Sequence, residues 1–123
     1  MVVLILVAVI VVFSLNPTLP RTANIRIIEA QPGMCPANDT IACGFNPSTS
    51  KIAFGGLVIW FNNDKLNHTI TWGNQANGLP WGLPSSGPVA PQAAYIISSI
   101  KVGGTLSHRC SIHPWMTGTL IVQ

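Results

Sequence analysis

Charged side chains are scarce in this 123-residue sequence, at 7% of the total, and only three residues are acids. The acids are Glu29, Asp39 and Asp64. Six Lys and Arg residues give a net charge of +3, but they are scattered and form no basic cluster that could follow a phosphate backbone. Apolar residues make up 48% of the chain, which excludes a disordered composition. We therefore expect a folded protein with no nucleic-acid partner.

A helical pattern is also missing after the first fifteen residues. Short apolar or alternating runs stand between clusters of Gly, Pro, Asn and Ser instead, and such runs are typical of strands. We expect strands within residues 25–28, 51–54, 57–61, 67–72, 93–102, 105–110 and 119–122. A chain of this length can build one sandwich core but not two domains. The sequence therefore predicts a single all-β sandwich over residues 24–123.

Residues 1–15 carry no charge, and Ser14 is their one polar side chain. A helix of fifteen residues spans about 22 Å, which is short of a hydrocarbon core of about 30 Å. The run therefore reads as a signal peptide or as an uncleaved membrane anchor, joined to the domain by a linker at residues 16–23. Both interpretations place the domain outside the cytoplasm, for example in a periplasm, and the second attaches it to the membrane.

The residues that carry chemistry are concentrated near the C-terminus. Cys110, His113 and Met116 offer a thiolate, an imidazole and a thioether at positions i, i+3 and i+6, and this ligand set suits copper. A second imidazole is available from His68, which follows an apolar run. His108 lies two residues before Cys110 and shares its strand face, so we interpret it as a packing residue or a neighbour of the ligands.

Two segments resemble the small blue copper proteins called cupredoxins. Residues 104–122 are similar to the closing segment of that family, and residues 58–69 are similar to the strand and loop that carry its first histidine. The spacing around His113 looks most like that of amicyanin, whose ligand loop is shorter than that of plastocyanin. The resemblance implies a Greek-key β-sandwich with one copper ion at one end.

The resemblance also implies roles for individual residues. His68, Cys110 and His113 would bind the copper ion in a plane, and Met116 would be a long, weak axial ligand. Packing of Met116 in the core, with water or an empty position at the metal, is the alternative. Thr69 matches a position whose side chain connects the two ligand loops in the family, and such contacts orient the ligands.

The sequence has three cysteines, an odd number that fits one working thiolate plus one pair. Cys35 and Cys43 would form that pair as a disulfide, which agrees with an exported protein. Two alternatives are that both are reduced and buried, or that they belong to a second metal site.

No acid or base for substrate chemistry accompanies these motifs, so the sequence predicts an electron carrier rather than an enzyme. Pro114 and Trp115, with Trp81 as a third candidate, would form an apolar patch where partners such as oxidases, reductases or cytochromes dock at the edge of His113. A second hypothesis is an open copper site that reacts with nitric oxide or nitrite. A third is copper delivery or storage.

Overall fold

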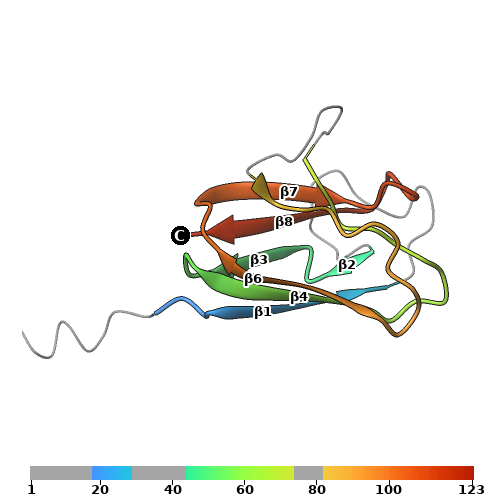
Figure 1. The fold of residues 1–123 in the computed structure, drawn as a ribbon, viewed down its shortest axis with the longest axis horizontal. Helices are drawn as coiled ribbons and strands as arrows, with labels where there is room; N and C mark the ends of the chain where they lie inside the picture. The colour runs from blue at the N-terminus through green and yellow to red at the C-terminus, as the bar shows by residue number, and fades with distance from the viewer. Residues whose placement is uncertain (1–17, 29–43, 74–81) are drawn as a thin grey trace, which may run out of the picture.

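The computed structural model describes residues 18–28, 44–73 and 82–123, which form eight strands in two sheets (Figure 1). The strands are β1 (Thr22–Ile27), β2 (Phe45–Asn46), β3 (Thr49–Ile52), β4 (Gly56–Asn62), β5 (Thr71–Trp72), β6 (Ala94–Ile100), β7 (Gly104–Arg109) and β8 (Thr117–Val122). One sheet has the order β2-β1-β4-β6 and the other has the order β3-β8-β7-β5. The predicted all-β sandwich is confirmed.

Buried and more exposed side chains alternate along β1 and β4. In β1 the side chains of Ala23, Ile25 and Ile27 are buried, whereas the three residues that alternate with them are exposed. β4 alternates in the same way, and it pairs in parallel with β1 and antiparallel with β6. Successive side chains of a strand point to opposite faces, so one face of this sheet is directed into the core.

The core between the sheets is built mainly from large apolar side chains. Those that are almost fully buried are Trp60, Trp72, Phe45, Ile25, Ile27, Ile52, Ile70, Ile100, Leu106, Met116 and Leu120. Trp60 and Trp72 meet edge to face, with ring centroids 5.7 Å apart, which is a favoured aromatic geometry. Each sheet contributes one of these two rings, so they join the two layers.

The loops that carry the predicted ligands lie at one end of the sandwich. β7 and β8 pair from Gly104↔Val122 to Arg109↔Thr117, so residues 110–116 form the connection of a hairpin. β4 runs parallel to β1 and ends at Asn62, just before the loop that contains His68. Both loops lie at the right of Figure 1, opposite the C-terminus.

Several strand boundaries differ from the prediction. β1 begins at Thr22, inside the segment that we expected to be a linker, because Thr22 and Ala23 already pair with β4. β2 lies in a region that we expected to be irregular, and two residue pairs with β1 hold it there. Such short strands are fixed by pairing with distant partners rather than by their own composition.

The expected extended run over residues 67–72 is only partly a strand. β5 comprises two residues, and the rest of the run lies beside the segment that contains Ser86 and Val89. His68 and Val89 exchange backbone hydrogen bonds, and the Ser86 hydroxyl accepts one from the Ile70 N–H. This segment therefore covers the edge of the sheet next to the first ligand loop.

Several expectations fall outside the described residues. They concern the signal or anchor at residues 1–15, the proposed disulfide between Cys35 and Cys43, and Trp81. In the part of the chain that the structure does describe, no helix is long and apolar enough to cross a membrane.

Candidate metal centre

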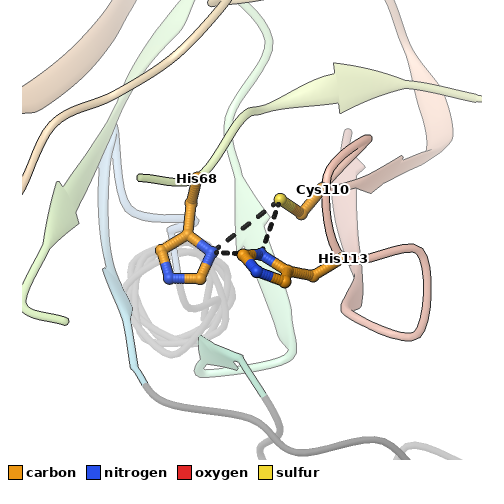
Figure 2. A group of neighbouring side chains, drawn as sticks. All are labelled: His68, Cys110 and His113. Carbon is orange, nitrogen blue, oxygen red and sulfur yellow. Dashed lines mark hydrogen bonds between the residues drawn. The ribbon is translucent and has the colours of Figure 1, made fainter. Parts of the chain in front are cut away.

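Three side chains from the two loops point toward one another (Figure 2). The Cys110 Sγ atom lies 3.5 Å from Nδ1 of His113 and 3.8 Å from Nδ1 of His68. The two Nδ1 atoms are 3.1 Å apart. His68 is separated from the other two by more than forty positions in the chain, so the folding of the sandwich is what brings the group together.

The separations of these three atoms fit a single metal ion. Bonds of about 2.0–2.1 Å to nitrogen and about 2.3 Å to sulfur would hold trigonal ligand atoms roughly 3.5–3.8 Å apart. The measured distances of 3.1, 3.5 and 3.8 Å are close to this range. Two imidazoles and one thiolate are ligands that suit copper, so the chemistry of the donor set agrees with its geometry.

Cys110 is held where β7 ends. Its side chain is fully buried, and its sulfur accepts a hydrogen bond of 3.3 Å from the backbone N–H of Thr69. Its own N–H donates to the carbonyl of Met116, which closes the loop on itself. A hydrogen bond to a ligand sulfur is one way in which a protein adjusts the electronic properties of a bound metal.

The Thr69 hydroxyl connects the two loops. Its Oγ1 accepts the backbone N–H of Ser111 at 2.8 Å and lies 3.0 Å from the hydroxyls of Ser111 and Thr71. Together with the bond from its N–H to Cys110, these contacts fix the first histidine loop against the cysteine loop. Protein groups alone therefore connect the loop of His68 to the loop of Cys110.

Met116 is fully buried and belongs to the core cluster. Its N–H donates to the carbonyl of His113, which closes a tight turn at the end of the loop. Gly44, with φ of +78°, packs against it, and a Cβ atom at Gly44 would lie 2.6 Å from Cγ and Cε of Met116. This close approach requires glycine. The Met116 side chain is thus confined in the core.

His113 is only partly buried, in contrast to His68, which is 1% exposed. The ring of Trp115 lies beside it, with centroids 5.3 Å apart, and Trp115 also packs against the core. Pro114 is exposed, as is half of the side chain of Ile112. An imidazole edge among apolar side chains therefore reaches the surface at this loop.

Asp64 also contacts the site, although the sequence analysis named it only as one of the three acids. Its Oδ2 atom lies 2.7 Å from Nε2 of His68, whereas Nδ1 of the same ring faces Cys110. Burial would raise the pKa of Asp64, but hydrogen bonds from His68 and the Lys65 backbone, together with electrostatic interactions with His68 and His113, hold the pKa below its usual value. In a loop that is not helical, a spacing of four residues does not predict a contact with His68, so no signal in the sequence could have identified Asp64.

Asn62, also missed, fixes the loop that carries Asp64. It is fully buried, and its side-chain amide donates to the carbonyls of Leu66 and Val89 at 2.8 and 2.9 Å. Its Oδ1 accepts the backbone N–H of Asp64 at 3.0 Å. A buried amide with all these partners holds a loop rigidly, because releasing any of them leaves a buried polar group unpaired.

His108 lies in the core below the site and is not part of the converging group. Its ring meets Phe45, Trp60 and Trp72 edge to face at 4.7 to 5.6 Å, and Gly118 leaves the space that the ring occupies. Neither ring nitrogen has a hydrogen-bond partner among the described residues. Burial lowers the pKa of His108 to about 3, so the ring is neutral. It is a packing residue.

Comparisons with known proteins agree with this geometry. No protein-family model and no curated protein matches the sequence. Among solved structures, the chain is similar to a purple cupredoxin from Nitrosopumilus maritimus, with 27% identity, a TM-score of 0.62, and coverage of 82% of this chain and 99% of that one.

Two further similarities concern the fold. A Cu-containing nitrite reductase from Thermus scotoductus SA-01 is 20% identical with a TM-score of 0.59, and the match covers 89% of this chain but 23% of the reductase. A variant of amicyanin in its Cu(I) form is 15% identical with a TM-score of 0.59, over 84% of this chain and 83% of that one.

Proposed function

Because the chain has the fold of the cupredoxins and a His-Cys-His group that fits their ligand site, we propose that it is a copper protein that carries single electrons between redox proteins. His68, Cys110 and His113, with Met116 as a weaker ligand, would hold one copper ion, which would supply one-electron chemistry through its Cu(I) and Cu(II) states. No covalent change of a substrate is required.

The observation that carries this proposal is the convergence of His68, Cys110 and His113 in a group that hydrogen bonds hold in place. Thr69 ties the loops together, and the Cys110 and Met116 backbones close the second loop. Cu(I) and Cu(II) prefer different geometries, so a ligand set that the protein holds fixed reduces the rearrangement that accompanies electron transfer. Such rigidity favours a carrier.

Electrons would enter and leave through His113, since it is the partly exposed member of the group. We propose that Pro114 and Trp115 contact the partner, with Trp81 as a further candidate. Oxidases, reductases or cytochromes outside the cytoplasm could exchange single electrons with such a protein, and we propose them as its partners. This location rests on residues 1–15, read as a signal peptide or as an anchor that keeps the domain at the membrane.

A second candidate is a copper site that reacts with nitric oxide or nitrite. It is favoured by the similarity in fold to a Cu-containing nitrite reductase, and it requires a free coordination position. The two candidates differ in the role of Met116, which would bind the metal in the carrier and only pack in the core in the open site, and its complete burial is compatible with both. Burial of His68 and Cys110 speaks against copper delivery, which needs ligands that exchange readily.

The test is the absorption and EPR spectrum of the copper-loaded protein, compared with Cys110→Ser and Met116→Ala. We expect an intense visible thiolate-to-copper band that Cys110→Ser abolishes and Met116→Ala shifts, with a change in copper hyperfine splitting. A band that is insensitive to Met116→Ala but perturbed by added nitrite or nitric oxide would favour the second candidate. Absence of the band in the unsubstituted protein would refute a copper–thiolate site.

A further inference from the structure

Asp64 is the only acidic side chain in residues 18–28, 44–73 and 82–123, and it lies against a candidate ligand. In a chain with three acids and a net charge of +3, a carboxylate at this position is unusual. Its side chain is only 8% exposed. A carboxylate is rarely buried to this degree unless it is paired, and here its partner is the imidazole of His68.

The contact determines which nitrogen of His68 is free for a metal. Nε2 lies 2.7 Å from the Asp64 carboxylate, whereas Nδ1 faces Cys110 and His113. An ionised carboxylate is an acceptor only, so Nε2 must carry the proton that it donates. Nδ1 of the neutral ring is then left with its lone pair directed at the metal position.

The carboxylate is itself held in place at both oxygen atoms. Oδ1 accepts the N–H of Lys65 at 2.7 Å, while Oδ2 accepts from His68. The backbone N–H of Asp64 donates to Asn62, which is fixed to the carbonyls of Leu66 and Val89. The negative charge therefore occupies a defined position rather than a mobile one in solvent.

From these contacts we propose that Asp64 is a positioning residue of the metal centre, which orients His68 and places a fixed negative charge behind it. This inference rests on the proposed copper function. Cu(II) with one thiolate carries a net charge of +1, and Cu(I) with one thiolate is neutral. The Asp64 charge attracts the first state and not the second, so it favours oxidised copper and lowers the reduction potential.

Two substitutions separate orientation from charge. Asp64→Asn keeps an oxygen that can accept from Nε2 but removes the charge, whereas Asp64→Ala removes both. Lys65→Gln is the matched control, because it also changes the charge by one on the same turn, but with an exposed side chain whose charge water screens. Reduction potentials and the affinities for Cu(II) and Cu(I), from competition with chelators, are measured on all four proteins.

We expect Asp64→Asn to raise the reduction potential and to weaken Cu(II) binding more than Cu(I) binding. Asp64→Ala should lose about 10–100-fold in Cu(II) affinity, as is usual when the partner of a ligand histidine is removed. Lys65→Gln should change neither property. A merely structural role for Asp64 would leave the potential of Asp64→Asn where it is.

The results distinguish this inference from the function on which it rests. A thiolate-to-copper band in the unsubstituted protein, with Asp64→Asn indistinguishable from Lys65→Gln in potential and in Cu(II) affinity, would overturn the role of Asp64 alone. Absence of that band would overturn the copper function together with this inference.

Discussion

The two loops of the candidate centre differ in how they hold their histidines. His68 is 1% exposed and has the Asp64 carboxylate on its outer nitrogen, while His113 is partly exposed and has the ring of Trp115 beside it. Under the proposed function, the first loop would hold the metal and the second would exchange electrons at the surface. The two histidines would then divide these tasks between a buried side and an accessible side of the site.

The largest expected effect is on stability in acid, and it comes from His108. Like His68, His108 is buried, but it has no carboxylate partner within the described residues. Its folded-state pKa of about 3 lies below the ordinary value of 6.5, so the unfolded chain binds the proton more readily between these values. The contribution of the neutral His108 ring to the free energy of unfolding is fully present above pH 6.5. It falls by about 1.4 kcal/mol per pH unit as the pH is lowered from 6.5 toward 3.

The measurement is chemical denaturation of the metal-free protein from pH 7 to pH 4, compared with His108→Leu. The variant loses the ring contacts and is less stable at pH 7, but its free energy of unfolding should fall less steeply with acid. Equal slopes for the two proteins would show that His108 does not account for the acid sensitivity.

Asn62→Ala should make the loop that carries Asp64 and His68 less rigid, so that it no longer differs from the second loop in this respect. The substitution removes two hydrogen bonds to buried or partly buried carbonyls and one from the Asp64 N–H. A loss of about 2–3 kcal/mol in the free energy of unfolding is expected. Thermal unfolding of the metal-free protein measures it, with the exposed neighbour Asn63→Ala as the control. Similar stability of the two variants would contradict the role given to Asn62.

Trp115→Ala tests the second loop and should have the smallest effect on stability. The ring is partly buried beside His113, so its loss should leave the visible band of the copper protein in place. We expect the rate of electron exchange with a redox partner, or between oxidised and reduced copies, to change several-fold through altered docking. An unchanged rate, measured by stopped flow, would show that Trp115 does not contribute to the surface that contacts the partner.

Much of the candidate site was predictable because it depends on residues close in sequence. Cys110, His113 and Met116 lie within one seven-residue connection, so their neighbourhood follows from chain length alone. The strand expected within residues 25–28 was equally predictable, because its apolar run is a local pattern. Strand boundaries such as the start of β1, and the existence of β2, were missed because pairing with distant strands decided them.

The sequence by itself determined the all-β class and the set of residues that suits copper, since local periodicity and donor chemistry are properties of short segments. Only the tertiary structure decided that Asp64 lies on His68, that Gly44 packs on Met116, and that His113 rather than His68 is the more exposed. Each of these depends on how two sheets and their loops pack, and the spacing of residues along a chain does not specify that packing.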